Sequence, residues 1–379
     1  MQEDRMTNTY KEIFQQPVVW KKEYQLILDE KERIKTFVSK HHISIDSEIL
    51  LTGAGTSAFI GDVLSFILSQ KGFKNCKAVS TTDLITHPKV FLSTERKQVL
   101  ISFARSGNSP ESLAAVKLAN SICKEVTHIV ITCNEKGALA QNANPENTLM
   151  LLLPPETNDK SLAMTSSFTT MMFACLLFIN IDKIEEQRPL VDNLCKNAQN
   201  ILEKYEMPLK EIAGRGFNRA IFLGSGELKG IAEECHLKLQ ELTDGEVICK
   251  FDSFLGFRHG PKAVINNQSV IVYLFSGNEY ALQYEKDLVA QINSNNNVVA
   301  QIAVSQNKIE IPSVQFDLNI ITTATPQSDN EYGCIPYVFA GQLFGLFKSV
   351  ERGLNPDSPS VSGNISRVVE GVKIYDFMK

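Results

Sequence analysis

One pattern occurs twice in this 379-residue chain: a hydrophobic strand, a glycine-containing turn, and a second glycine-containing turn about fifty residues later. In the first copy Gly55 and Gly107 are 52 positions apart, and in the second copy Gly226 and Gly277 are 51 positions apart. Strand and turns that stay in step over such a distance predict two related α/β units.

The two copies differ in the chemistry of their second turns. Ser109 closes the first turn, whereas acidic Glu279 stands at the matching position of the second. A hydroxyl can donate a hydrogen bond to an anion and a carboxylate repels one. We therefore expect an anion site in the first half and a different task for the second.

Hydrophobic strands alternate with helical segments through both halves. The predicted strands are Glu48–Thr52, Lys77–Ser80, Gln98–Phe103, His128–Cys133, Thr148–Leu153, Arg219–Leu223, Val247–Phe251, Ser269–Phe275, Val298–Val304 and Val314–Leu318. This alternation is typical of parallel sheets that helices cover on both faces. We predict an α/β fold of two tandem domains, 41–200 and 201–354, each with a roughly five-stranded parallel sheet flanked by helices. A helical leader (1–40) precedes them, and an extended tail (355–379) is expected to close the active site.

Composition narrows the function. The net charge is −5 and basic residues are not clustered, so we expect no nucleic-acid partner. No uncharged stretch reaches the roughly 20 apolar residues of a membrane span, and the polar start does not resemble a signal peptide. The eight cysteines include no C-x-x-C pair. Buried thiols in a reducing cytoplasm are therefore expected, rather than disulfides or a zinc site.

An anion pocket is predicted in the first half. Ligands of open parallel sheets bind beyond the carboxyl ends of the strands, where both turns of the first copy lie. Each turn opens a helix whose free N–H groups and positive dipole end suit a phosphate. A third helix begins at the same sheet edge. The predicted substrate-binding residues of this region are Gly55, Ser57, Arg105, Ser106, Ser109, Thr165 and Ser166.

Two alternatives stand beside this pocket. Gly53-x-Gly55-x-x-Ala58 after a strand satisfies a dinucleotide-binding pattern, with Asp83 as a loose candidate for its ribose-binding acid. That pattern explains neither the second turn nor the duplication. The serines are otherwise ordinary helix N-caps, which is a common role for serine. Several hydroxyl-rich turns at one sheet edge favour the phosphate pocket over both.

An acid/base set is predicted in the second half. Glu234, Lys238 and Glu241 are spaced to share one helix face, and His259 lies in a later turn. Read separately, the first two form a solvated ion pair and the histidine is a loop residue. Read together, carboxylates beside a lysine and a histidine that titrates near neutrality can move protons on a sugar without a metal or an organic cofactor.

These motifs resemble those of the sugar isomerase (SIS) domain family. The resemblance covers roughly residues 40–379 and is strongest to AgaS-type galactosamine-6-phosphate deaminases and to the isomerase half of glucosamine-6-phosphate synthase. It rests on Ala104-Arg105-Ser106-Gly107-Asn108-Ser109, on Asn158–Thr169, on Lys238-Leu239-Gln240-Glu241 and on His259-Gly260-Pro261. It implies two tandem SIS domains and a homodimer or higher homo-oligomer with shared active sites.

The resemblance also implies residue roles. Glu241 would move the proton between C1 and C2, and His259 from a neighbouring subunit would open the sugar ring. Lys238 and Glu234 would orient the substrate, with Lys238 in the catalytic set and Glu234 among the binding residues. The catalytic lysine of the family tail aligns with Arg367, which cannot form a Schiff base, so we assign Arg367 to binding.

The expected activity is deamination and isomerisation of D-galactosamine 6-phosphate to D-tagatose 6-phosphate and ammonia. Gln2 stands where glucosamine-6-phosphate synthase has its glutaminase cysteine, so we expect no ammonia from glutamine. One alternative is a tagatose-6-phosphate ketose/aldose isomerase that releases no ammonia. Another is a non-catalytic sugar-phosphate sensor, which would leave the acid/base set without a use. The leader shows no helix-turn-helix signal that such a regulator would need.

Overall fold

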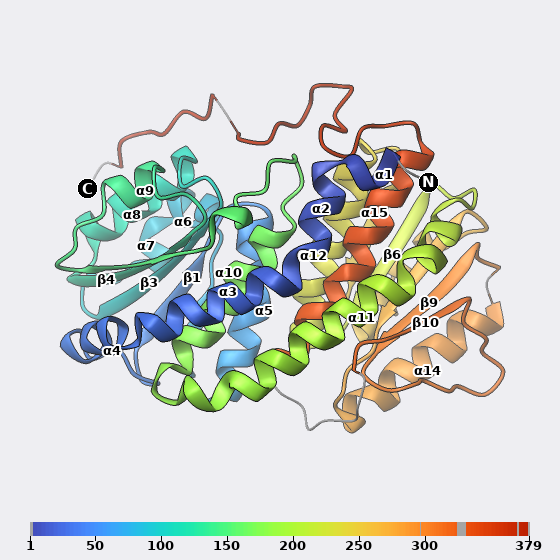
Figure 1. Cartoon of the computed structure of the whole chain (residues 1–379), viewed down its shortest axis with the longest axis horizontal. Helices are drawn as coiled ribbons and strands as arrows, with labels where there is room; N and C mark the ends of the chain where they lie inside the picture. The colour runs from blue at the N-terminus through green and yellow to red at the C-terminus, as the bar shows by residue number, and fades with distance from the viewer. Residues whose placement is uncertain (1–2, 296, 324–330, 370, 378–379) are drawn as a thin grey trace. The chain divides into compact units, whose positions relative to one another are not determined.

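A computed structural model describes residues 3–295, 297–323, 331–369 and 371–377 of the chain. Two compact units are present, and Figure 1 follows the chain through them by colour. The β1 unit comprises Val18–Asp159, Met164–Asp192 and the chain from Ser366 onward. The β6 unit comprises the chain up to Pro17, Lys160–Ala163 and Asn193–Ile365. The predicted domain boundaries at residues 40, 200 and 354 stay predictions.

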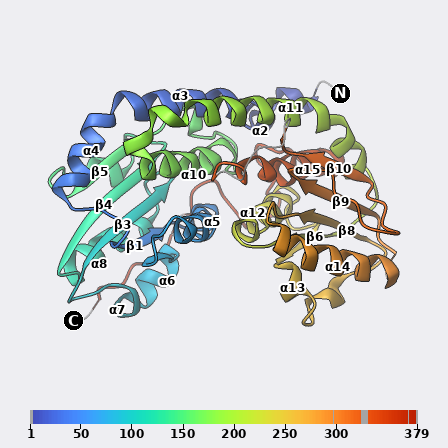
Figure 2. The same cartoon turned by 90° about the horizontal axis from the view of Figure 1, so that it is seen from below.

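Five parallel strands form the sheet of the β1 unit, in the order β2-β1-β3-β4-β5. The strands are β1 Glu48–Thr52, β2 Cys76–Ala78, β3 Lys97–Ala104, β4 Glu125–Thr132 and β5 Thr148–Leu152. The helices are α5 Thr56–Gln70, α6 Thr81–Thr86, α7 Pro88–Phe91, α8 Pro110–Ile122, α9 Ala138–Gln141 and α10 Ser166–Ile179. Figure 2 shows α6, α7 and α8 along one face of this sheet and α10 across the other. Strands covered on both faces are buried along their length, as β3 and β4 are after their first residues.

The sheet of the β6 unit also has five parallel strands, in the order β7-β6-β8-β9-β10. The strands are β6 Arg219–Gly224, β7 Ile248–Asp252, β8 Ser269–Leu274, β9 Ala300–Ser305 and β10 Leu318–Ile321. The helices are α12 Glu227–Leu242, α13 Phe254–Phe257, α14 Glu279–Asn295 and α15 Phe339–Glu351. On one face, Ile271 of β8 packs with Phe254 of α13 and Leu288 of α14 in the core.

Both sheets share one strand order, with the first strand of each between its second and third. The expected α/β fold with two five-stranded parallel sheets is therefore confirmed. One strand was misplaced: Val314–Leu318 was predicted, but β10 begins at Leu318. The Val314 amide donates to the Ile311 carbonyl in a turn, and Val314 and Phe316 pack on the core from a loop. The hydrophobic pattern of this segment therefore resembles that of a strand, although its residues before Leu318 do not form one.

The leader is helical, as predicted, and contains α1 Glu3–Met6, α2 Asn8–Phe14, α3 Gln16–Asp29 and α4 Lys31–Lys40. Within the β6 unit, the tail carboxylate of Asp357 accepts hydrogen bonds from the amides of Asn8 (2.9 Å) and Thr9 (2.8 Å) and so caps α2. Within the β1 unit, the Trp20 indole of α3 donates to Thr169 Oγ1 of α10 at 3.1 Å. Helix α11 (Arg188–Ala213) follows α10 along the chain. After α15 the described residues form turns and extended coil, as the prolines and glycines of the tail predicted.

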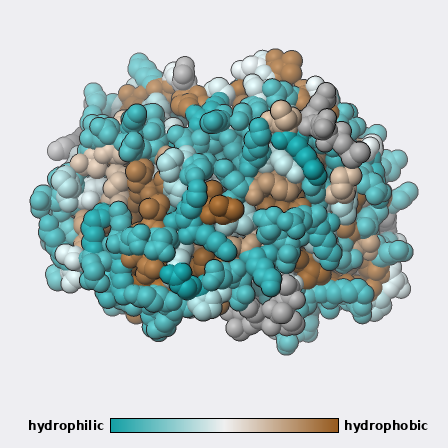
Figure 3. Space-filling model, in the orientation of Figure 1, coloured by the Kyte–Doolittle hydropathy of each residue, from teal (hydrophilic) through white to brown (hydrophobic). Residues whose placement is uncertain are grey.

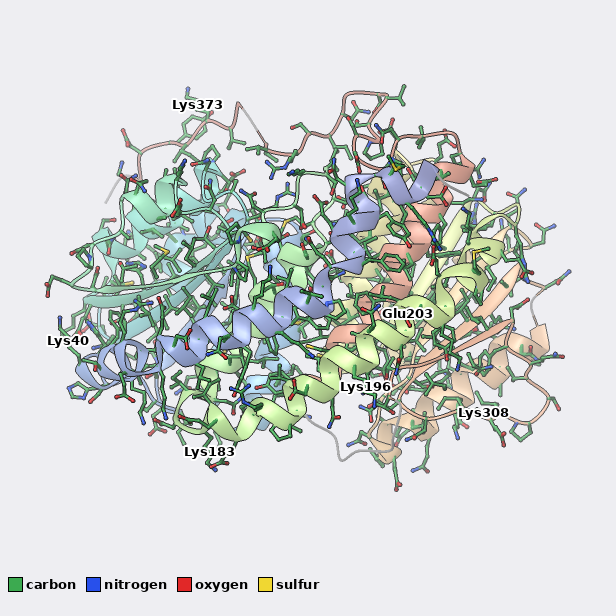
Figure 4. The ribbon with its side chains drawn as sticks, viewed as in Figure 1. Lys40, Lys183, Lys196, Glu203, Lys308 and Lys373 are labelled. Atoms are coloured by element: carbon green, nitrogen blue, oxygen red, sulfur yellow. The ribbon has the colours of Figure 1, made fainter. Side chains whose placement is uncertain are left out.

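The face drawn in Figure 3 is mainly hydrophilic, with hydrophobic residues in small scattered patches. Exposed ion pairs such as Lys40–Glu146 and Lys308–Glu310 lie on the surface, where both lysines are labelled in Figure 4. Such pairs contribute at most about 1 kcal/mol each. Within the described ranges, helices long and apolar enough to cross a membrane are absent. All eight cysteines are free thiols.

Candidate active site

The first predicted phosphate turn begins where β1 ends. A Cβ at Gly53 would lie 2.5 Å from the backbone of Ser57, so only glycine allows α5 to start this close to the strand. Gly55 adopts φ +55°, in the region that favours glycine. Ser57 is buried in the first turn of α5, and its Oγ lies 3.9 Å from Met164 Sδ. Among the described residues, the start of α5 thus has no side-chain cap, although the Ser57 and Ala58 amides donate to the Ala54 and Gly55 carbonyls within the turn.

The second predicted turn follows β3, which pairs in parallel with β1 and so ends at the same sheet edge. Ser109 caps α8: its Oγ accepts from the Ser112 amide at 3.3 Å and lies 2.6 Å from the Ser112 hydroxyl. Gly137 packs against the turn, since a Cβ there would lie 2.4 Å from the Ser106 carbonyl oxygen. Ser106 itself is half-buried. The predicted helix start and serines are present at this turn, and their role in binding stays a prediction.

A buried carboxylate, Asp159, organises the start of α10. It accepts hydrogen bonds from the amides of Thr165 and Ser167, both at 2.9 Å, and from the hydroxyls of Ser166 and Ser167. These groups are buried, so the helix start already binds an anion supplied by the chain. Thr165 and Ser166 were predicted to bind substrate, and that assignment stays a prediction.

The tail contributes Arg367 to the same region of the β1 unit. Its guanidinium donates to the Asp159 carbonyl oxygen (2.9 Å from Nε) and to Asn158 Oδ1 (2.9 Å). Arg105, which is 7% exposed, donates from its own guanidinium to the Arg367 carbonyl at 2.6 Å. Two arginines that the sequence placed in the substrate site are thus brought together, 262 positions apart in the chain. Guanidinium groups are well suited to bind a phosphate.

The predicted acid/base cluster lies on α12 of the β6 unit. Lys238 Nζ forms an ion pair with Glu241 and lies 3.4 Å from Glu234 Oε1. Lys238 and Glu234 are fully buried, and Glu241 is only slightly exposed. Burial lowers the pKa of Lys238, but the two carboxylates outweigh it, so the pKa is raised above the ordinary lysine value. The lysine is therefore an ammonium ion between two carboxylates rather than a surface charge.

His259 lies apart from this cluster in its bonding. It occupies the exposed turn after α13, where Gly260 adopts φ +115°. Across the described part of the chain, His259 makes no hydrogen bond or ion pair with Lys238 or Glu241. Its side chain is exposed.

A metal site would need several ligand side chains close together. Within the residues that the structure describes, no group of three or more His, Cys, Asp or Glu side chains is arranged to hold a metal ion. The cluster on α12 instead pairs its carboxylates with an internal cation.

Comparison with known proteins identifies the family. The SIS domain model matches residues 42–181. The D-galactosamine-6-phosphate deaminase AgaS of Escherichia coli is 40% identical over 372 residues, which cover 97% of this chain and 96% of that protein. The chain belongs to the AgaS family of SIS-domain proteins. The predicted family membership is confirmed.

Solved structures agree with the AgaS assignment. The tagatose-6-phosphate ketose/aldose isomerase from Escherichia coli matches with a TM-score of 0.89 and 37% identity, covering 99% of this chain and 98% of that one. The C-terminal domain of glucosamine-fructose-6-phosphate aminotransferase from Francisella tularensis matches with a TM-score of 0.77 at 16% identity, covering 92% and 97%. The second likeness shows a shared fold alone.

One residue of this AgaS-family site was missed from the sequence. Asp159 stands six positions before Thr165, outside the usual N-cap position, and reaches the helix start because the intervening chain loops back. In the sequence, the available signal for this role was an acid a few residues ahead of the hydroxyl-rich stretch Thr165–Ser167. Reading it required knowing the path of the loop.

Proposed function

We propose that this chain is a D-galactosamine-6-phosphate deaminase that forms D-tagatose 6-phosphate and ammonia. The observation that carries the proposal is the buried Glu234–Lys238–Glu241 cluster in a chain 40% identical to an AgaS deaminase. A sensor that only bound sugar phosphate would have no use for a buried ammonium between two carboxylates. Burying such charges costs several kcal/mol each, which a catalytic role would justify.

The chemistry requires a proton to move between neighbouring carbons. In the open-chain substrate Glu241 removes the proton from C2, giving an enolamine, and the proton returns at C1. This leaves an imine at C2, which water hydrolyses to the ketone and ammonia. The ammonium of Lys238 pairs with Glu241, which places a positive charge beside the proposed base. The overall reaction consumes one water, so we propose a hydrolase acting on a carbon–nitrogen bond.

The β1 unit would bind the phosphate. The starts of α5 and α8, the hydroxyls of Ser57 and Ser106, and the guanidinium of Arg105 would offer donors and positive charge at one sheet edge. Ser109 would join them once its hydroxyl turns away from Ser112. Holding the ester fixes the rest of the sugar, which is the entropic part of catalysis. Arg367 supports this role by linking Arg105 to Asn158 and Asp159.

A second candidate is favoured by one observation. The Escherichia coli structure matched at a TM-score of 0.89 bears the name of a tagatose-6-phosphate ketose/aldose isomerase. That reaction uses the same proton transfer but begins from a sugar without an amino group. Release of ammonia therefore separates the two functions.

The test is incubation of the purified full-length chain with galactosamine 6-phosphate, glucosamine 6-phosphate and tagatose 6-phosphate. Ammonia and ketose 6-phosphate are measured together in each reaction. We expect equal amounts of both from galactosamine 6-phosphate. Aldose formed from tagatose 6-phosphate, with no ammonia from either amino sugar, would replace our proposal by the isomerase.

The first prediction concerns Glu241. Glu241→Gln removes the base while keeping the side chain's shape, so we expect turnover to fall by about 10²–10⁴-fold. Substrate binding, measured by calorimetry, should change little because the phosphate contacts remain. Glu203→Gln on α11, an exposed acid labelled in Figure 4, is the matched control and should retain full activity. Undiminished turnover in Glu241→Gln would remove the assigned base.

The cellular location and the oligomeric state are also proposals. We propose a cytoplasmic enzyme, because free thiols in all eight cysteines suit a reducing compartment. We further propose a homo-oligomer in which His259 acts in the active site of a neighbouring subunit, supported by its exposed turn.

A further inference from the structure

The β6 unit contains a buried carboxylate that the proposed reaction does not use. Glu285 lies in α14 and is 1% exposed. Its Oε2 accepts a hydrogen bond from the Ser276 amide at 2.9 Å. Ser225, of the first turn, lies close enough to lower the pKa of the carboxyl. Its Oε1 is buried without a hydrogen-bond partner among the described residues. The carboxylate is thus bonded to the second glycine-containing turn of its unit and lies beside the first.

These two turns correspond to the predicted phosphate turns of the β1 unit. Gly226 has φ +60° and ψ −132°, and Gly55 has φ +55° and ψ −131°. A Cβ at Gly224 would lie 2.2 Å from the Leu228 backbone, as one at Gly53 would meet Ser57. The backbone that precedes α12 is therefore built like the backbone that precedes α5.

The second turns correspond in the same way. Ser276 follows β8 and precedes α14, as Ser106 follows β3 and precedes α8. Nine residues after Ser106 stands Ala115, a buried residue of α8, and nine residues after Ser276 stands Glu285. At this buried position, counted from the turn, the methyl group of Ala115 in α8 corresponds to the carboxylate of Glu285 in α14.

We propose that the β6 unit contains an anion pocket at Ser225 and Ser276 that Glu285 fills from within, and that removing this side chain opens the pocket to inorganic phosphate. Backbone amides and hydroxyls at a helix start bind any small anion of suitable size. A carboxylate held by the chain satisfies the same donors without a ligand. Phosphate esters are therefore excluded from this turn in the intact chain.

Two further features bear on the strength of this site. Ser225 and Ser276 are partly exposed and Gly226 is exposed, so solvent reaches the turns. Glu227, at the start of α12, acts on Glu285 as a neighbouring negative charge. Burial raises the pKa of the Glu285 carboxyl, against the lowering effect of the Ser276 and Ser225 hydrogen bonds. Burying the Glu285 carboxylate in the pocket therefore costs free energy. An anion bound in its place would also be repelled by the negative charge of Glu227.

The test counts inorganic phosphate bound by the full-length chain, using calorimetry at low ionic strength. Glu285→Ala should bind one more phosphate per chain than the unsubstituted protein. Glu285→Gln, which keeps the space filled, should bind no more than the unsubstituted protein. Asp287→Ala removes an exposed acid from the same helix and controls for the change in net charge; it should also add no site.

Soaking crystals of Glu285→Ala in phosphate should then show the ion at the Ser276 amide. Glu285→Ser is measured in parallel, so that bound phosphate can still be counted if Glu285→Ala does not fold. A folded Glu285→Ala or Glu285→Ser chain with the phosphate count of the unsubstituted protein would overturn the proposal. Because neither sugar nor turnover is measured, failure here leaves the proposed deaminase activity untouched, and failure of that activity leaves this count unaffected.

Discussion

Two buried lysines of the β6 unit show how surroundings decide the state of a charge. Lys348 donates to the carbonyl oxygens of Ala213 and Arg215, both at 3.0 Å, and pairs with Glu351. Burial lowers the pKa of Lys348, and that single carboxylate does not reverse the shift. Lys238, between two carboxylates, has a raised pKa instead. Proton chemistry on α12 therefore begins from a fixed ammonium ion.

A buried acid of the leader gives a prediction for pH. Glu23 in α3 is 1% exposed, and burial together with the charge of Glu30 raises the pKa of its carboxyl well above the ordinary value. Such a group stabilises the fold most below its unfolded-state pKa, and this stabilisation is lost as pH rises through the folded-state pKa. Glu23→Gln should therefore gain unfolding free energy relative to the unsubstituted chain as pH rises. The gain should be about 1.4 kcal/mol for each unit by which the pKa is raised.

Urea unfolding of both proteins, followed by circular dichroism at a series of pH values above the ordinary glutamate pKa, measures the difference in unfolding free energy. Glu32→Gln, which replaces an exposed acid of α4, controls for the loss of one carboxyl group from the leader. A Glu23→Gln curve parallel to the unsubstituted one would show that the carboxyl does not titrate on folding as we infer.

At the scale of elements, α12 is held against α15 by two glycines. A Cβ at Gly341 would lie 2.5 Å from Cys235 Cα, and one at Gly345 would lie 2.9 Å from the Lys238 carbonyl oxygen. Side chains at these positions would push the helices apart. The position of the acid/base cluster therefore depends on residues of α15 that do no chemistry.

Gly341→Ala should destabilise the chain by about 1–3 kcal/mol, because the added methyl group must displace backbone. Turnover should also fall, since α12 contains Glu234, Lys238 and Glu241. Thermal unfolding and the ammonia assay measure the two effects. Gly216→Ala, where a Cβ would meet nothing within 4 Å, controls for the effect of alanine on the unfolded chain. Equal melting temperatures for the two variants would contradict the tight helix contact.

Most elements were predictable from the sequence because their signals are local. Strands such as β3 and β8 are rich in Val, Ile and Leu, and a glycine follows each of them within three residues. Val314 failed as a strand residue because a loop can bury the same side chains without pairing. Asp159 and Glu285 were missed for a different reason. Each bonds a helix or turn that the chain brings to it only after folding, and no spacing rule records such an approach.

At the scale of the whole molecule, the proposed oligomer gives a prediction. If His259 serves a neighbouring subunit, a chain with Glu241→Gln and a chain with His259→Asn are each inactive alone but complement each other when co-expressed. In a two-fold dimer, random pairing restores one site in half of the molecules, so about a quarter of full activity should return. Activity no greater than the sum of the two variants would place His259 in its own subunit's site.

Because the two units share their strand order and their glycine geometry, matched substitutions in one unit and in the other can be compared within the same protein. An alanine at Gly55 and an alanine at Gly226 would force nearly the same backbone angles on a residue that resists them. Strain would then be common to both variants. Whatever distinguishes their consequences, measured in one protein under one set of conditions, would report on what each turn does rather than on how it is folded.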